Sequence, residues 1–340
     1  MITKADDVFE YLSRVSTLEG YRMIGDTVRG IKDEKLRNIC TVNGTAFSPF
    51  FVPTRDVAAP VLNNTQWLYV VAQARIAAAN TSTQRILVAA PMKSGSTFIS
   101  KALAKGLNLP QLSLIMLLAR AYDYACYGAA IRAHEIDELA LLSACCGSSG
   151  FLAHHHMLAS PFLAKQASLY GLDVVVIKRN IFDMLVSLDD FQLQQGKILK
   201  AAGEDDFFQQ GLPDNYQALD FDQRISRLLD RNLNFYVSYY TSWTLAESRG
   251  LIKPFWISYE DEIAGGARAL SVRVADAFAR TDADAERLTA ALAQGGNMEH
   301  VHFNKGIAGR GAAITGHNRE RVLEAFADFD HVGDWSEILG

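Results

Sequence analysis

The sequence predicts an α/β protein with a central parallel sheet flanked by helices. Three short apolar runs are interpreted as buried strands: RILVAAP from Arg85, GLDVVVIKRN from Gly171 and PFWISYED from Pro254. Segments with helical spacing lie between these runs, and strands that alternate with helices are typical of a parallel sheet. The four consecutive apolar residues of the second run indicate a central strand that is buried on both faces.

The residues before the first strand are predicted to form an N-terminal elaboration. Residues 1–80 combine helical periodicity with the proline-containing stretch FSPFFVPTRDVAAP. We expect this part to pack on one main domain that covers residues 81–340. A chain of 340 residues is long enough for a single large domain with a substantial core.

Composition, charge and cysteine usage limit the location and the partners. The net charge of −5 does not favour binding to nucleic acid or to anionic lipid. The N-terminus, MITKADDVFEYLSR, lacks a signal-peptide pattern. The longest apolar run, Leu112–Tyr122, is shorter than the about 20 residues that span a bilayer, and we interpret it as a core helix or a wall of an apolar cleft. The four cysteines form no C-x-x-C pair, which indicates buried free thiols, so we expect a cytoplasmic protein without membrane insertion.

The first strand leads into a turn that suits an anion. This turn, PMKSGSTF, precedes the predicted helix TFISKALAKGL, and a helix N-terminus offers unpaired N–H groups and the positive end of the helix dipole. Gly95 allows close approach of the backbone, and Lys93 adds a positive charge. Ser96 and Thr97 add hydroxyl donors. The alternative is an ordinary glycine-containing turn with a surface lysine, since the P-loop pattern G-x-x-x-x-G-K-[ST] is absent.

Two further basic stretches are candidates for phosphate binding. Arg179 ends the second strand, and Ser187 lies about two turns into the predicted helix IFDMLVSLDDFQ. An arginine fork and a hydroxyl near a helix start make a second anion site. The stretch FNKGIAGRG, from Phe303 to Gly311, predicts a flexible cationic loop that closes over a phosphate-bearing ligand.

Three consecutive histidines lie in FLAHHHMLASP. On a strand, His154 and His156 share a face, and His155 points to the other face. Metal binding is one interpretation, although no carboxylate or cysteine lies close in the sequence. Packed or hydrogen-bonded histidines are the alternative for at least one of the three.

Taken in order, these motifs resemble those of the sulfotransferases that use PAPS (3′-phosphoadenosine 5′-phosphosulfate). PMKSGSTF is similar to their 5′-phosphosulfate loop, and KRNIFDMLVS is similar to their 3′-phosphate motif, R-N-x-x-D-x-x-x-S. NKGIAGRG resembles their C-terminal loop, R-K-G-x-x-G-D-W, and WISYED resembles a Y-E-D stretch upstream of it. The resemblance covers about Arg85 to Arg310 and implies a single-domain, P-loop-containing nucleotide-hydrolase-like sulfotransferase fold.

The resemblance also implies site residues. The family's catalytic histidine ends a strand upstream of the 3′-phosphate motif, which corresponds to His156 here, with His155 as the alternative after a shift of one residue. Lys93 would stabilise the charge that grows on the leaving phosphate. The residues implied to bind PAPS, or its product PAP, are Lys93, Ser94, Gly95, Ser96, Thr97, Phe98, Arg179, Ser187, Asn304, Lys305, Gly306 and Arg310. No metal is required in this scheme.

Some residues depart from the family pattern. Phe98 stands where many members have tryptophan, so the expected aromatic surface for adenine is smaller. Asn304 stands where arginine is usual, which removes one phosphate contact. Arg310 and Gly311 replace the aspartate–tryptophan pair, so Lys305, Arg310 and backbone N–H groups are expected to bind the phosphate.

The predicted function is in-line transfer of a sulfuryl group from PAPS to a hydroxyl or amine of a small-molecule, lipid or sugar acceptor, with His156 as general base. The alternatives are a magnesium-dependent P-loop nucleotide kinase and a catalytically inactive nucleotide-binding protein of the same fold.

Aromatic segments such as NFYVSYYTSW are candidate walls for an apolar acceptor. Asp189 and Asp190 bind a cationic acceptor or form a solvated helix face. Residues 192–220 are a substrate loop or lid, or else a surface insertion. The C-terminal RERVLEAFADFDHVGDWSEILG predicts an amphipathic helix. This helix packs either on its own domain or on a partner, so the sequence leaves both a monomer and a homo-oligomer as alternatives.

Overall fold

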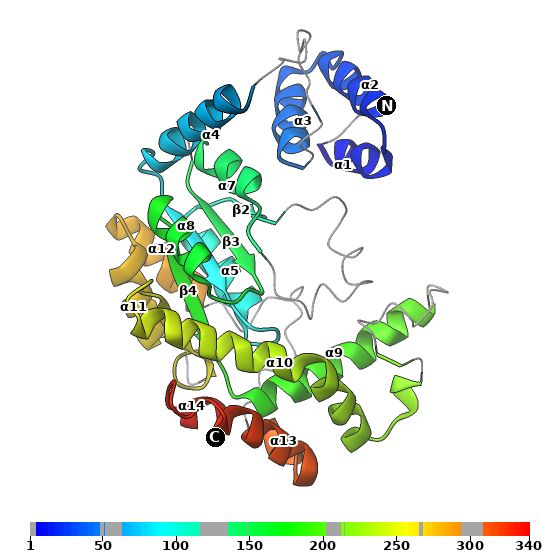
Figure 1. The fold of residues 1–340 in the computed structure, drawn as a ribbon, viewed down its shortest axis with the longest axis vertical. Coiled ribbons are helices and arrows are strands. Elements are labelled where there is room, and N and C mark those ends of the chain that lie inside the picture. The colour runs from blue at the N-terminus through cyan, green and yellow to red at the C-terminus, as the bar shows by residue number, and fades with distance from the viewer. Residues whose placement is uncertain are drawn as a thin grey trace. The chain divides into compact units, whose positions relative to one another are not determined.

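Figure 1 shows the fold of the chain in a computed structural model. The structure describes residues 5–47, 51, 63–115, 135–147, 149–201, 212–213, 215–264, 268–293 and 309–340. Contacts divide the chain into two units, formed mainly by residues 1–82 with 136–147 and by residues 83–112 with 148–340. The main stretch of the first unit thus ends at Ser82, and residues 136–147 join it from later in the chain.

The first unit is helical. Its helices are α1 (Ala5–Arg14), α2 (Leu18–Arg29), α3 (Glu34–Phe47), α4 (Asn64–Ala79) and α7 (Glu138–Cys145). The first three share a small apolar core that contains Val8, Leu12, Ile24, Val28, Cys40 and Phe51. α4 contacts α7, and the Nε of Arg75 lies 2.7 Å from the Oε1 of Glu138 in an ion pair.

The second unit contains a five-stranded parallel sheet in the order β2-β3-β1-β4-β5. The strands are β1 (Arg85–Ala89), β2 (Gln111–Leu112), β3 (Phe151–His155), β4 (Asp173–Lys178) and β5 (Phe255–Ser258). The α/β prediction and the three predicted strands are therefore confirmed. The third strand is shorter than predicted, because Tyr259–Ala264 forms a π-helix, η4, instead of extending it.

Helices cover both faces of this sheet (Figure 1). One face packs against α5 (Ser96–Gly106), α11 (Arg268–Phe278) and α12 (Asp282–Ala293), which contribute residues such as Leu103, Val274 and Leu288 to the main core. On the other face lies α10 (Phe221–Ser248), whose Tyr239 hydroxyl donates to the carbonyl of Ala89 at 2.9 Å. α10 therefore reaches the end of β1, where the turn toward α5 begins.

The remaining described helices connect the strands or follow the last strand toward the C-terminus. They are α8 (Pro161–Leu169), α9 (Ile181–Ala201), the 3₁₀ helices η3 (Tyr216–Ala218) and η6 (Arg310–Ala313), α13 (Gly316–Ala327) and α14 (Ser336–Leu339). The predicted C-terminal helix is thus two helices, with a break between them.

α9 corrects the prediction of a loop or lid at 192–220. Residues 192–201 continue the 21-residue α9. Gly196 lies inside this helix, but a glycine costs only about 1 kcal/mol there relative to alanine, which is too little to end a long helix. Residues 202–211 and 214 lie outside the described residues.

Two further predictions concern thiols and apolar length. Cys40 and Cys145 are buried free thiols as predicted, whereas Cys146 is exposed, and Cys126 lies outside the described residues. Most of the apolar run Leu112–Tyr122 also lies outside them. Within the described ranges, none of the helices combines the length and apolar character needed to cross a bilayer.

Candidate active site

The turn after β1 adopts the backbone expected of an anion-binding loop. Lys93 and Gly95 have positive φ angles of 64° and 85°, and Gly95 is the N-cap residue of α5. A Cβ atom at Gly95 would lie 2.9 Å from the ring of Tyr259, so only glycine fits here. No side chain caps α5 in the described structure, so this 11-residue helix directs N–H groups and the positive end of its dipole into the turn.

Arg179, which the sequence assigned with Ser187 to a second anion site, lies beside this turn, and its side chain is held from two directions. Its Nη1 donates to the carbonyl of Lys93 at 2.6 Å, and its guanidinium carbon lies 3.7 Å from the centre of the Tyr259 ring. The side chain is 7% exposed, and its Nε has no hydrogen-bond partner among the described residues. A buried N–H group without an acceptor is costly, so this Nε indicates an acceptor that the described protein does not supply.

Lys93 extends toward α9. Its Nζ lies 4.4 Å from the centre of the Phe191 ring. Burial, followed by the nearby charge of Arg179, lowers the pKa of Lys93 to about 8, while Asp190 acts in the opposite direction. The two cations thus face the same small region, and an anion placed there would offset their mutual repulsion.

The histidines lie at the end of β3, next to β1. His155 is the last residue of β3, pairs with Ala89 and is 4% exposed. The Nδ1 of His156 lies 2.8 Å from the carbonyl oxygen of Ala90. Because a carbonyl only accepts, Nδ1 carries the hydrogen in neutral His156 and Nε2 is the basic nitrogen. The rings of His154 and His156 lie edge to face at 5.4 Å, which confirms that they share a face.

α9 contains most of the second predicted motif and begins directly after its asparagine. The Oδ1 of Asn180 accepts from the backbone N–H groups of Phe182 and Asp183, at 3.0 and 3.1 Å, and so caps α9. Ser187, one turn after Asp183, is 4% exposed.

The described end of the C-terminal loop is held on the same helix. Asp183 accepts from the N–H groups of Gly309 and Gly311, at 2.7 and 2.5 Å, and Arg310 donates to Asp190 at 2.5 Å. The other predicted residues of this loop, Asn304, Lys305 and Gly306, lie outside the described residues.

Several predicted contacts differ in the structure. Phe98 is 5% exposed and belongs to the main core, so its ring is packed among apolar side chains rather than offered to adenine. The hydroxyl of Ser94 donates to the carbonyl of Pro91 at 2.8 Å and thus holds the turn itself. Ser96 is 4% exposed, while Thr97 is partly exposed.

The two neighbouring aspartates of α9 both have protein partners. Asp189 is 2% exposed, and accepts from Arg224 at 2.8 and 3.0 Å and from the hydroxyl of Tyr216 at 2.7 Å. Asp190 forms the ion pair with Arg310. Asp189 is therefore neither a solvated residue nor a ligand for a cationic acceptor, because its carboxylate is already neutralised inside the fold.

Sequence reasoning missed the role of the tyrosines of α10. The hydroxyl of Tyr240 donates to the carbonyl of Arg179 at 2.9 Å and accepts from its N–H at 3.1 Å, and that of Tyr236 lies 3.4 Å from the carbonyl of Met92. Burial holds the pKa of Tyr239 and Tyr240 well above the ordinary value, so both remain donors. NFYVSYYTSW thus supports the site through buried hydroxyls rather than forming an acceptor wall, and the spacing Y-x-x-Y-Y was the available signal for a shared helix face.

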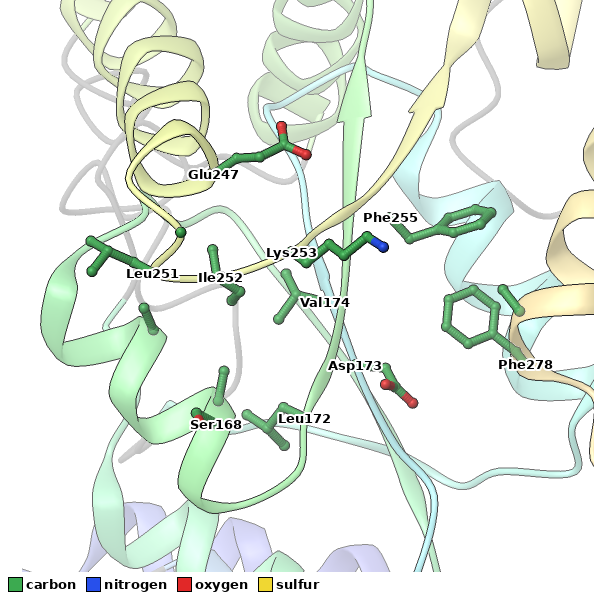
Figure 2. Close-up of a pocket in the computed structure, with 14 residues that line it drawn as sticks. Ser168, Leu172, Asp173, Val174, Glu247, Leu251, Ile252, Lys253, Phe255 and Phe278 are labelled. Carbon is green, nitrogen blue, oxygen red and sulfur yellow. The ribbon is translucent and has the colours of Figure 1, made fainter.

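A hollow of about 870 Å³ lies at the opposite, amino-terminal ends of β4 and β5. Figure 2 shows Phe255 and Phe278 on one side of it, with ring centres 5.1 Å apart, and Leu251 and Ile252 across from them. Its lining contains none of the predicted site residues. Within the described ranges, no three His, Cys, Asp or Glu side chains gather as metal ligands would.

The described site therefore consists of the β1–α5 turn with Lys93, the buried Arg179, the oriented His156 and the C-terminal segment on α9. Comparison with known proteins adds no relative: no family model matches the chain, and the search of curated proteins gave no match.

Proposed function

We propose that this protein transfers a sulfuryl group from PAPS to a hydroxyl or amine of an acceptor. The observation that carries the proposal is the convergence of two cations and one oriented imidazole on the carboxyl ends of β1, β3 and β4. Lys93 and Arg179 are joined by a hydrogen bond of 2.6 Å, and His156 is bound to Ala90, three residues before Lys93. In parallel α/β sheets, ligands bind outside this edge.

Each residue has a role in the proposed reaction. PAPS supplies the sulfuryl group. The Nε2 of His156 accepts the proton of the acceptor group as it attacks, and the hydrogen bond from Nδ1 to Ala90 keeps the ring in the required orientation. Lys93, with the N–H groups of the α5 N-terminus, stabilises negative charge on the leaving phosphate. Arg179 holds the main chain of the turn and offers its Nε to an anionic oxygen.

The second phosphate would bind along α9. Ser187 and the segment with Arg310 supply a hydroxyl and a cation at one place on this helix. A requirement for a 3′-phosphate distinguishes PAPS from ATP-type nucleotides. The absent G-K-[ST] pair, which places magnesium in P-loop enzymes, argues against the kinase alternative.

Ligand-dependent thermal unfolding tests the nucleotide class. We expect PAP to raise the melting temperature without magnesium, because a ligand that binds only the folded state stabilises it. Stabilisation by ATP with magnesium, but not by PAP, would support a kinase instead. The Lys93→Ala variant should lose the PAP effect, whereas Lys101→Ala, which changes a lysine of α5 outside the turn, should keep it.

Turnover tests the reaction itself. Protein, PAPS and a panel of phenols, alcohols, sugars and amines are incubated, and mass spectrometry detects an added sulfuryl group together with PAP. PAP binding without transfer to any acceptor would favour the catalytically inactive alternative. Transfer by wild type and loss of transfer in His156→Ala would support the proposed base.

A further inference from the structure

Two carboxylates of α9 hold the same short segment of the chain. Asp183 and Asp190 lie seven residues apart, so they share a helix face. The Oδ2 and Oδ1 of Asp183 accept from the N–H groups of Gly309 and Gly311, at 2.7 and 2.5 Å. Asp190 binds the side chain of Arg310, which lies between those two glycines. The segment 309–311 therefore lies along α9 and not merely near it.

Close packing also restricts where this segment can lie. A Cβ atom at Gly311 would lie 2.4 Å from the Cβ of Phe182, 2.7 Å from its carbonyl carbon and 2.8 Å from the backbone nitrogen of Asp183. Two of these three atoms are backbone and cannot move aside. Gly309 has a φ of 84°, which favours glycine. Residues 309 and 311 are thus fitted to the first turn of α9.

The segment lies where the proposed 3′-phosphate site is. Ser187 is one turn beyond Asp183 and three residues before Asp190, so it lies on the stretch of α9 that residues 309–311 follow. Lys93 marks the other end, since its Nζ lies over Phe191, about 6 Å further along the helix axis than Ser187. α9 therefore links the lysine of the first motif to the hydroxyl of the second.

We propose that Asp183 is a positioning residue for recognition of the nucleotide's 3′-phosphate. It touches no reacting atom. It binds the backbone N–H groups of Gly309 and Gly311, and thereby fixes where the segment with Arg310 lies along α9 beside Ser187. This inference rests on the proposed function, because it concerns the phosphate that separates PAP from adenosine 5′-monophosphate (AMP).

The carboxylate is needed for a chemical reason. Asp183 is 4% exposed and uses one oxygen for each N–H group. Asparagine has the same shape but replaces one oxygen with an NH₂ group, which would face an N–H donor. The Asp183→Asn variant therefore breaks one of the two hydrogen bonds without creating a cavity.

The experiment measures binding of PAP and AMP by calorimetry in three variants. Asp183→Asn removes an acceptor, and Gly311→Ala displaces the same segment by collision with the first turn of α9. Asp276→Asn, an exposed aspartate of α11, is the matched control. We expect both test variants to bind PAP about tenfold to a hundredfold more weakly, with AMP affinity unchanged. With PAPS, KM should rise while kcat changes little, as for loss of uniform binding.

Hydrogen exchange of the peptide that contains residues 309–313 supplies the structural readout. Faster exchange in both test variants, together with the selective loss of PAP affinity, supports the inference. Equal losses of PAP and AMP affinity would overturn it, since Asp183 would then only support the fold. Tighter PAP binding in Asp183→Asn would also overturn it, because the carboxylate would be a repulsive charge. If wild type binds AMP and PAP equally, the proposed function fails and this inference fails with it. If wild type prefers PAP over AMP and both test variants keep the same preference, this inference is refuted. The proposed function then stands.

Discussion

Replacing Lys93 with methionine should make the folded protein more stable while removing its affinity for anions. The Lys93 side chain is largely buried, and burial together with the charge of Arg179 lowers its pKa from 10.5 to about 8. The folded protein therefore keeps an ammonium in an unfavourable place. Methionine has a similar length and retains the packing on Phe191, but it carries no charge.

The size and the pH dependence of the effect follow from that pKa. A fall from 10.5 to about 8 corresponds to about 3 kcal/mol of cost for charging Lys93 in the folded state. Below pH 8 both the folded and the unfolded wild type are protonated, so the full cost is present. Between pH 8 and 10.5 the unfolded state binds more protons, so wild-type stability rises with pH. The advantage of Lys93→Met should therefore be greatest below pH 8 and shrink above it.

Urea denaturation of both proteins between pH 6 and pH 10 measures this difference. Lys101→Met serves as the control, because this lysine lies on α5 and outside the β1–α5 turn. An advantage of about 3 kcal/mol at pH 7 that declines above pH 8 is expected. Equal stability of Lys93→Met and wild type across this range would refute the account of a buried, repelled ammonium. The same variant should no longer be stabilised by PAP.

Three other substitutions test the frame of the site. Gly95→Ala forces a Cβ atom against the ring of Tyr259 at a residue with a positive φ. We therefore expect urea denaturation to show a loss of about 1–3 kcal/mol in the free energy of unfolding, and we expect PAP binding to be lost. Near-wild-type values for both measurements would contradict the described turn. Tyr240→Phe removes the hydroxyl that binds both backbone groups of Arg179. The free energy of unfolding, measured by thermal or chemical denaturation, should fall by about 1–3 kcal/mol. An unchanged value would show that the hydroxyl does not support the end of that strand. His156→Ala should abolish sulfuryl transfer in the mass-spectrometric assay and leave PAP affinity nearly intact, and full turnover by this variant would exclude His156 as the base.

The sequence predicted what depends on local chemistry. The apolar run at Arg85, the following proline and Gly95 were enough to predict a strand, a turn and a helix start. Strand alternation correctly placed His154 and His156 on one face. The hydrogen bond between Arg179 and the carbonyl of Lys93 was not predictable, because it joins residues 86 apart in the chain and depends on strand order. Motif order indicated that such residues converge, but not which atoms meet.

The errors have physical causes as well. Tyr259–Ala264 continues from a strand-like run, but its acidic residues bind backbone and arginine groups in a π-helical turn, which periodicity does not reveal. Phe98 was judged by its place in a motif, whereas its side chain completes the core beneath α5. Asp189 was judged as a surface residue because its partners, Tyr216 and Arg224, lie 27 and 35 residues away.

The tyrosines of α10 attach to main-chain atoms and not to side chains. Their hydroxyls end on the carbonyls of Ala89, Met92 and Arg179. A carbonyl is present whatever the residue, so these hydrogen bonds make no direct demand on the side chains of the three residues that accept them. Shape and chemistry are thus specified by different parts of the chain. A designer who wishes to change the ligand can vary Lys93 and keep Ser94, Gly95 and the tyrosines of α10, which preserve the geometry.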